Sequence, residues 1–527
     1  MRISTSQFFE STSATYQNNF SSVIKTQSQI DSGVRIQTAA DDPVGAARLL
    51  QLQQQKDMLA QYSTNMNSIK SSLGAQEAVL DSINNSLQKA SELALRAGGG
   101  ISDADRGAIA NELGSIEEQV FSLLNSKDAS GNYMFSGSKT DTPPYTRNND
   151  GTYSYQGDDT QLNLKVSDTL ALASSDTARC IMEGATNTGR TQATFVPGVD
   201  ANGEPTVNDG KLSVSAGLVT SSAVFNKSFA EGQPYKLTFI SSTQFKLTKS
   251  PDDEDITSQV PGNGVFDPTK EGSQSISLHG VSFDITPNLK DVPAAERDAL
   301  VAGRSFTLEA KADTINASRT PGNSSTAQLT ESTVTDAGVY GDSFPSNGAV
   351  IKFTSATEYE VYAQPLTADS KSIAKGDVAS GALGVDFKFS GTPEAGDQFV
   401  VNRNNHQSQN ALDTISQLRK ALEIPSDKDP LAQQTQKDAI NSAIGNLKNA
   451  SAGVDSARGS IGARLKAVDI QADENISLGL ANDSTTAAIG NTDMAGASIE
   501  LAFQKAMLEA SQLAFVKISQ LSLFNQL

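Results

Sequence analysis

Apolar residues near the start of the chain recur with a seven-residue spacing. Phe9, Tyr16, Val23 and Ile30 follow this spacing, and Phe20 falls on an adjacent turn. Positions seven apart share one face of a helix, so the pattern predicts a helix with one narrow apolar stripe. The other positions are mostly Ser, Thr, Gln and Asn, which favour helix only modestly. We expect this helix to be stable only against a partner.

The stretch SGVRIQTAADDPVGAARLL, residues 32–50, interrupts the helical pattern. Gly33 is a natural helix end, because glycine enters the left-handed cap without strain. Asp42 followed by Pro43 is a natural helix start, since the carboxylate caps free N–H groups and proline suits the first helical position. We therefore expect a short hinge in which Gly33, Asp41, Asp42 and Pro43 determine where the next helix begins.

A stronger pattern follows the hinge. The seven-residue spacing holds for Leu52, Leu59, Met66, Leu73, Leu80, Leu87 and Ala94, with offset positions Tyr62, Ile69, Ile83 and Ala90. This pattern predicts a coiled-coil seam on a helix of residues 43–97. Three glycines, 98–100, end it, and Ser102 with Asp105 can cap a third helix. A long helix and its return can pack antiparallel.

The C-terminal part mirrors this arrangement. The same spacing relates Ile440, Leu447, Val454, Ile461 and Val468, with Ala443, Ala450 and Ala457 beside them. A Gly, Ser and Thr rich stretch, SLGLANDSTTAAIGNTD, then predicts a break at 477–493, before a last helix. Because both ends carry a terminal helix, a break and a long seam, we expect them to meet. Ordinary bundle helices are the alternative for any single repeat.

The last helix is apolar over more than one face. One face carries Ile499, Phe503, Ala506, Ala510, Leu513, Leu521 and Phe524, and a neighbouring face carries Leu501, Leu508 and Phe515. A terminal helix of this kind needs partners on several sides. The residues predicted to carry terminal packing and assembly are Phe9, Tyr16, Phe20, Val23, Ile30, Leu501, Phe503, Leu508, Phe515, Leu521 and Phe524.

Residues 138–405 change to Gly, Asn, Asp, Thr and Pro turns between short alternating strands. Three pairs of segments keep their order within this region: LTFISSTQFKL with IKFTSATEYEV, GVSFDI with GVDFKF, and AGRSFTL with AGDQFVV. We interpret them as two related β-rich units. The acidic run at 252–255 lacks the alternation and central glycine of a calcium loop, so a solvated loop is the favoured interpretation.

These patterns predict an α+β multidomain protein, in which long antiparallel helices from both termini form a coiled coil and β-rich domains are inserted between them. We expect residues 1–40 with 485–527 to form a terminal assembly domain. Residues 41–186 with 406–484 would form a rod with a small β element, and residues 187–405 a variable, surface-exposed region.

Composition argues for structure and binding before catalysis. The net charge is -19, without a basic cluster, which disfavours a nucleic-acid partner. The N-terminus lacks a signal-peptide apolar region, and no run of apolar residues is long enough to span a membrane. Cys180 is the only cysteine, and His279 and His406 are the only histidines. Without a phosphate loop or nucleophile elbow, we expect no enzyme activity, cofactor or metal.

Motifs at both ends resemble a known family. The segments SGVRIQTAADDPVGAARLLQLQQQ, ELALRAGGG, RGAIANEL and GNYMFSG resemble the N-terminal core of the flagellin superfamily. Within it, MRISTSQFF, AQYSTNMNSIKSSL and the ending ISQLSLFNQL are similar to the hook-associated proteins of the hook–filament junction. The resemblance covers about residues 1–165 and 407–527. Filament flagellins typically open with an INTN-type segment, which is missing here.

The resemblance implies a structural subunit of the bacterial flagellum, involved in motility and joining hook to filament. It implies type III export without a cleaved signal, an extracellular location and assembly through the terminal helices. The implied partners are further copies in a ring or helical array, a hook-side hook-associated protein, filament flagellin, and a cytoplasmic export chaperone at the C-terminal helix.

Two alternatives remain open. The near one is a filament flagellin, which would differ in copy number per flagellum. The distant one is a carbohydrate-binding or enzymatic module displayed by the middle region. Carboxylates such as Asp284 and Glu296 lie there, but the sequence offers no pairing typical of a glycosidase.

Overall fold

The computed structural model describes residues 5–148, 151–199, 204–320, 322–367 and 369–524. The chain divides into two compact units. The first contains the chain up to Lys70, residues 163–172 and the chain from Arg464 onwards, and the second contains the rest. This division falls within the long helices, farther from the termini than the domain boundaries predicted near residues 40 and 485. The separate assembly and rod domains therefore stay a prediction.

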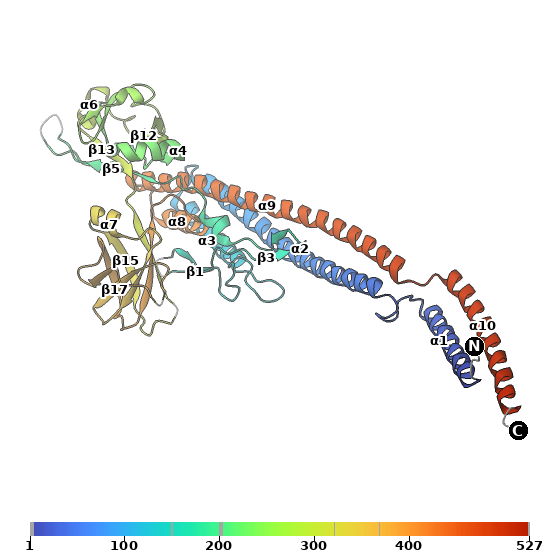
Figure 1. Ribbon diagram of the computed structural model, residues 1–527. Helices are drawn as coiled ribbons and strands as arrows, with labels where there is room; N and C mark the ends of the chain where they lie inside the picture. Colours follow the sequence, from blue (N-terminus) through green and yellow to red (C-terminus); the bar gives the residue numbers. More distant parts are fainter. Residues whose placement is uncertain (1–4, 149–150, 200–203, 321, 368, 525–527) are drawn as a thin grey trace. The chain divides into compact units, whose positions relative to one another are not determined.

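The first unit is built from helices of both chain ends. Helix α1 (Thr5–Ser32) lies beside α10 (Met494–Phe524) (Figure 1). The start of α2 (Pro43–Ala97) runs antiparallel to the end of α9 (Pro430–Gly490), as shown by the ion pairs Lys56–Asp483 (2.8 Å) and Lys70–Asp469 (2.5 Å). The strands β3 (Asn163–Lys165) and β4 (Ala171–Ala173) pair with each other.

Local sequence chemistry explains several helix boundaries. Helix α1 ends before Gly33, which has φ +70°, and α2 begins at Pro43. The hydroxyl of Ser102 accepts the backbone N–H of Asp105 (3.3 Å) and caps α3 (Asp103–Leu124). These starts and stops agree with the sequence expectations.

The C-terminal break is shorter than expected. Helix α9 continues through the Gly, Ser and Thr rich stretch to Gly490, and α10 begins at Met494. The prediction of a break across 477–493 is therefore wrong for most of that stretch. Packing overrides weak helix propensity here. Asn482, inside the stretch, is buried and donates its side-chain N–H to the carbonyl of Leu52 (2.9 Å).

The second unit contains the remaining lengths of α2 and α9, with α3 packed against α8 (Ala411–Glu423). The strands β1 (Tyr145–Arg147) and β2 (Tyr153–Tyr155) form a small ribbon. Seam residues in this part of the helices, such as Leu73, Leu80 and Ile461, are fully buried. Burial of these stripes stabilises the helical part.

The first β-rich part of this unit, which we call the N-terminal β module, covers residues 191–310. One sheet has the order β10-β9-β8-β13-β5, and the other β11-β12-β6, with β7 also paired to β12. The strands are β5 (Thr191–Val196), β6 (Leu212–Val214), β7 (Leu218–Val219), β8 (Tyr235–Ser241), β9 (Gln244–Lys249), β10 (Glu254–Asp255), β11 (Gln274–Leu278), β12 (Val281–Pro287) and β13 (Ser305–Ala310). Short helices are α4 (Ser222–Val224), α5 (Ala230–Gly232) and α6 (Ala294–Val301).

The second part, the C-terminal β module, covers residues 314–404. Its larger sheet has the order β18-β17-β16-β20-β14, and β15 pairs with β19. The strands are β14 (Thr314–Arg319), β15 (Gln328–Val334), β16 (Ala349–Phe353), β17 (Glu358–Ala363), β18 (Ala374–Asp377), β19 (Val385–Ser390) and β20 (Gln398–Asn404). One helix, α7 (Ala337–Ser343), precedes β16.

The matched sequence segments occupy equivalent strands of the two modules. The first pair covers the hairpins β8–β9 and β16–β17, the second leads into β12 and β19, and the third leads into β13 and β20. Gly280 and Gly384 both have positive φ (+83° and +76°). The carbonyl of Gly280 accepts the N–H of Thr220 (2.9 Å), and that of Gly384 accepts the N–H of Thr335 (2.9 Å). The sequence pairs therefore reflect a shared turn geometry as well as a shared strand order.

Candidate assembly interface

The terminal pair, α1 with α10, meets along one stripe of each helix. The more enclosed positions are spaced three and four apart, as in a helix-pair seam. They are Tyr16, Asn19, Val23, Thr26 and Ile30 on α1, and Leu501, Gln504, Leu508, Ser511 and Phe515 on α10. The enclosed positions on α1 thus include Tyr16, Val23 and Ile30 of the predicted stripe but not Phe9. On α10, the face predicted at Leu501, Leu508 and Phe515 is the enclosed one.

Aromatic rings close one end of this seam. The ring of Phe515 lies 5.2 Å from that of Phe9 and 6.3 Å from that of Tyr16, centroid to centroid. Phe20 lies off the seam and stacks on Tyr16 at 6.4 Å. Such ring pairs contribute more than their buried area alone.

Polar pairs alternate with the apolar residues of the seam. Asn19 donates its side-chain N–H to the hydroxyl of Ser511 (2.7 Å), and the hydroxyl of Thr26 donates to Gln504 Oε1 (2.8 Å). Hydrogen bonds add specificity but little net stability, because water satisfies the same groups in the separated helices. These polar pairs therefore favour one alignment of the two helices.

A second apolar row on α10 is not covered by the described residues of the first unit. Ile499, Phe503 and Leu513, which we call the outer row, are 73%, 61% and 66% exposed. On α1, Ile24 is 53% exposed. Single exposed apolar residues are ordinary, whereas a row along one helix marks an interaction surface.

The other predicted assembly residues differ in their position relative to the seam. Phe9, at 40% exposed, contacts the aromatic end of the seam, while Phe20 and Phe503 are exposed outside it. Leu521 and Phe524 fall within α10, but their side chains lie outside the described residues. A role of any of these residues in assembly stays a prediction.

The hinge and the C-terminal break pair with each other in the first unit. The N–H of Arg35 donates to the carbonyl of Gly490 (2.7 Å), and the N–H of Thr492 donates to the carbonyl of Gly33 (2.9 Å). Val34 and Asn491 thus form an antiparallel bridge. We call these paired segments, 33–35 and 489–492, the joint. Sequence reasoning missed this pairing, because nothing local marks a bridge between such distant residues.

Two carboxylates organise the hinge. Asp41 lies 2.6 Å from Lys25 Nζ and accepts the N–H of Thr38 (2.9 Å). The side-chain hydrogen bond from Lys25 is the main cause that lowers the pKa of Asp41 to about 2. Asp42 accepts the N–H of Gly45 (2.9 Å), which caps α2 and lowers the pKa of Asp42.

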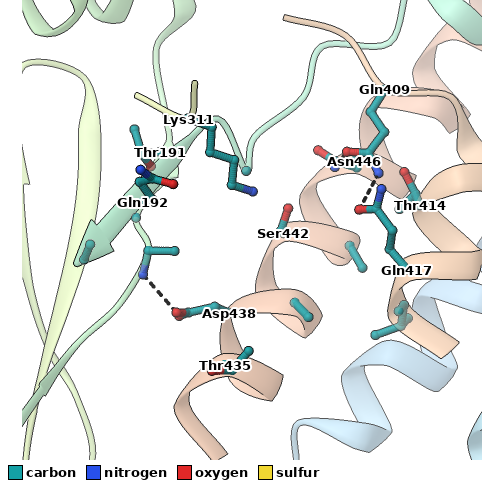
Figure 2. Close-up of a pocket in the computed structure, with 17 residues that line it drawn as sticks. Thr191, Gln192, Lys311, Gln409, Thr414, Gln417, Thr435, Asp438, Ser442 and Asn446 are labelled. Atoms are coloured by element: carbon teal, nitrogen blue, oxygen red, sulfur yellow. Dashed lines mark hydrogen bonds between the residues drawn. The ribbon is translucent and has the colours of Figure 1, made fainter. Parts of the chain in front are cut away.

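The second unit holds a cavity of about 360 Å³ between β5, α8 and α9 (Figure 2). Asp438 accepts the N–H of Ala216 (2.9 Å) and the side-chain N–H of Gln434 (2.8 Å), and burial raises its pKa to about 6. Burial also lowers the pKa of Lys311, whose side chain projects into the cavity. The described lining of the cavity contains neither His nor Cys, so the cavity walls show no nucleophile with an adjacent imidazole base.

The other residues singled out for chemistry have structural neighbours. His279 stacks on Tyr235 at 5.8 Å, and His406 Nε2 lies 3.0 Å from the carbonyl of Ala312. Asp284 accepts the hydroxyl of Ser275 (2.5 Å). Glu296 is exposed on α6.

Among the described residues, no group of three or more His, Cys, Asp or Glu side chains could hold a metal ion. In the acidic run, Glu254 and Asp255 form β10. No helix in the described ranges is both long and apolar enough to cross a bilayer.

Comparisons with known proteins point to flagellar components. Residues 3–140 match the family described as bacterial flagellin N-terminal helical region. Flagellar hook-associated protein 3 of Salmonella typhimurium is 29% identical over 188 residues, covering 36% of this chain and 58% of the relative. The protein of the same name from Escherichia coli is 29% identical over 147 residues, covering 28% of this chain and 46% of the relative. The chain thus spans about half the length of these curated relatives.

One match among solved structures is the flagellar hook associated protein-3 from Legionella pneumophila. It is 18% identical, with a TM-score of 0.49, and the match covers 82% of this chain and 96% of that one.

Proposed function

We propose that this chain, which carries a flagellin-type N-terminal helical region and resembles flagellar hook-associated protein 3, is a structural subunit joining hook to filament in the bacterial flagellum. The observation that carries the proposal is the outer row of α10. Ile499, Phe503 and Leu513 are each more than half exposed although α10 already packs on α1. A subunit of an assembly needs such a surface, because its neighbours supply the cover.

In this proposal the terminal helices carry the assembly. Each outer row is buried against neighbouring copies in a ring or helical array, at a gain of about 25 cal/mol per Å² of apolar surface. A hook-side hook-associated protein meets the array on one side and filament flagellin on the other. The role is structural and involves neither catalysis nor a cofactor.

Export precedes assembly in the same proposal. The chain passes through the type III apparatus unfolded, without a cleaved signal, and functions outside the cell. The single cysteine, Cys180, permits no intramolecular disulfide, which suits passage as an extended chain. A cytoplasmic chaperone covers α10 beforehand, since its apolar faces need cover in the cytoplasm as well.

The test separates the two faces of α10. F503D/L513D places charges on the outer row and should leave the terminal pair folded while abolishing filament attachment to hooks. L508D/F515D disrupts the seam itself and should lose both the pair and the junction. The measurement is electron microscopy of cells that make only the variant, with circular dichroism of the purified chain.

K505D is the matched control, because Lys505 is exposed on α10 outside both the seam and the outer row. It should support normal filaments. Filaments of normal number on F503D/L513D cells would refute the proposal. Copy number distinguishes the filament-flagellin alternative, since a junction requires few subunits per flagellum and a filament very many.

A further inference from the structure

The heptad seam of α9 changes from apolar to polar along its length. The positions Ile461 and Val468 are fully buried, and the next two positions of the same spacing are Asn475 and Asn482. These asparagines are 9% and 7% exposed, so they occupy the seam as the aliphatic residues do. The chain thus places two amides where its own pattern favours aliphatic side chains.

Both amides bind the backbone of the facing helix. Asn475 donates its side-chain N–H to the carbonyl of Leu59 (2.9 Å), and Asn482 donates to the carbonyl of Leu52 (2.9 Å). The donors and the acceptors are each seven residues apart, so one antiparallel register satisfies both bonds. The side-chain oxygen of Asn482 is buried and has no hydrogen-bond partner among the described residues.

We call residues 43–70 with 464–490 the distal rod. A buried polar seam position fixes the register of a helix pair at a cost in stability, and an unpaired buried oxygen adds to that cost. The ion pairs Lys56–Asp483 and Lys70–Asp469 compensate little, because all four side chains are at least 40% exposed.

Among the described residues, the distal rod has few other neighbours in the first unit. The β3–β4 hairpin contacts it through hydrogen bonds that include Tyr62 OH to Asp168 (2.7 Å) and Asn65 to the carbonyl of Lys165 (2.8 Å). Large aliphatic side chains of this segment remain in solvent, including Leu50 and Leu480, each 73% exposed. The distal rod therefore buries little apolar surface and places polar groups inside its seam.

We infer that Asn475 and Asn482 make the distal rod a segment that opens on its own and closes in a single register. Few buried apolar contacts give such a segment a low free energy of local opening. The two amides then select one pairing on closure, because a slipped helix would leave both donors without their carbonyls. The second unit keeps its apolar seam and stays closed. This inference holds whether or not the proposed function does.

Amide hydrogen exchange of the full chain, followed by mass spectrometry, tests it. Peptides from 43–70 and 464–490 should exchange faster than peptides from 430–463 in the wild type. N475L/N482L should slow exchange in the distal rod on the order of tenfold or more, because it extends the apolar seam and removes the unpaired oxygen. The single variant N482L should act in the same direction by a smaller factor, which guards against misfolding of the double variant.

S477L/S484L is the matched control. These serines lie two residues beyond each asparagine and are exposed, so the variant adds the same side chains outside the seam. Exchange in the distal rod should remain as in the wild type. Equal protection of 464–490 and 430–463 in the wild type would overturn the inference. Unchanged exchange in folded N475L/N482L or N482L would also overturn it.

Discussion

Arg35 of the hinge binds the last turn of α9. Its Nε and Nη2 donate to the carbonyl of Ile489 at 3.1 and 2.8 Å, and Nη2 lies 3.2 Å from Asp42 at the start of α2. A C-terminal carbonyl of one helix and the N-cap carboxylate of another thus share one guanidinium. This arrangement satisfies an orphan carbonyl and neutralises an acidic cap at once.

Replacing Arg35 should loosen the joint. R35A removes both bonds to Ile489 and the contact with Asp42, and should lower the free energy of unfolding of the first unit by about 1 kcal/mol, since the side chain is half exposed. R35K keeps the charge but lacks the planar fork, so its loss should be intermediate. Hydrogen exchange at 489–492 measures the effect. R48A, at an exposed arginine of α2, should leave it unchanged.

Gly45 should tolerate no side chain. A Cβ at this position would lie 2.6 Å from Ile36 Cδ1 and 2.5 Å from Asp42 Oδ2. G45A should therefore destabilise the first unit by about 1–3 kcal/mol through overpacking and loss of the cap. Gly74, in the same helix, has nothing within 4 Å of its Cβ position. G74A should stabilise the chain by about 0.5–1 kcal/mol, so equal effects of the two variants in chemical denaturation would contradict this account.

The predictable part of this fold is local. Gly33, Pro43 and Ser102 mark helix boundaries because glycine, proline and serine satisfy terminal backbone groups through their own chemistry. The heptad stripes predicted the long antiparallel helices, because heptad spacing can be seen in the local sequence. The segment around Asn482 was misjudged, because Asn482 occupies a seam position against α2, whose contacting residue lies more than 400 residues earlier in the chain.

The candidate site was predictable in part. The enclosed stripe of α1 and the face of α10 at Leu508 follow from periodicity. Periodicity does not say which of two apolar faces of α10 packs on α1 and which stays exposed, because that depends on the partner. The joint between Arg35 and Ile489 carries no sequence signal, since both groups act through geometry that only the folded chain creates.

Asp41 should make the first unit sensitive to acid. The hydrogen bond from Lys25 lowers the pKa of Asp41 from 3.8 to about 2, so the folded state holds the proton less tightly than the unfolded chain. Its stabilising contribution is therefore present above pH 3.8 and lost as the pH falls towards 2. D41N should lower the melting temperature at pH 6, and the difference from wild type should vanish near pH 2. A difference that persists at pH 2 would assign the effect to packing instead.

The turn glycines of the two β modules should each matter to their own module. Gly280 and Gly384 have positive φ, and a Cβ would lie 2.9 Å from the carbonyl oxygen of Ser221 and 2.5 Å from that of Asp336. G280A should destabilise the N-terminal module, and G384A the C-terminal module, each by about 1–3 kcal/mol.

Because the two modules have separate apolar cores, each variant should speed amide exchange in its own sheet and leave the other sheet as in the wild type. Gly341, with an open Cβ position, provides the control, and G341A should speed exchange in neither sheet. If G280A speeds exchange equally in β8–β9 and β16–β17, the modules fold as one cooperative body. Their matched turns would then be parts of a single core.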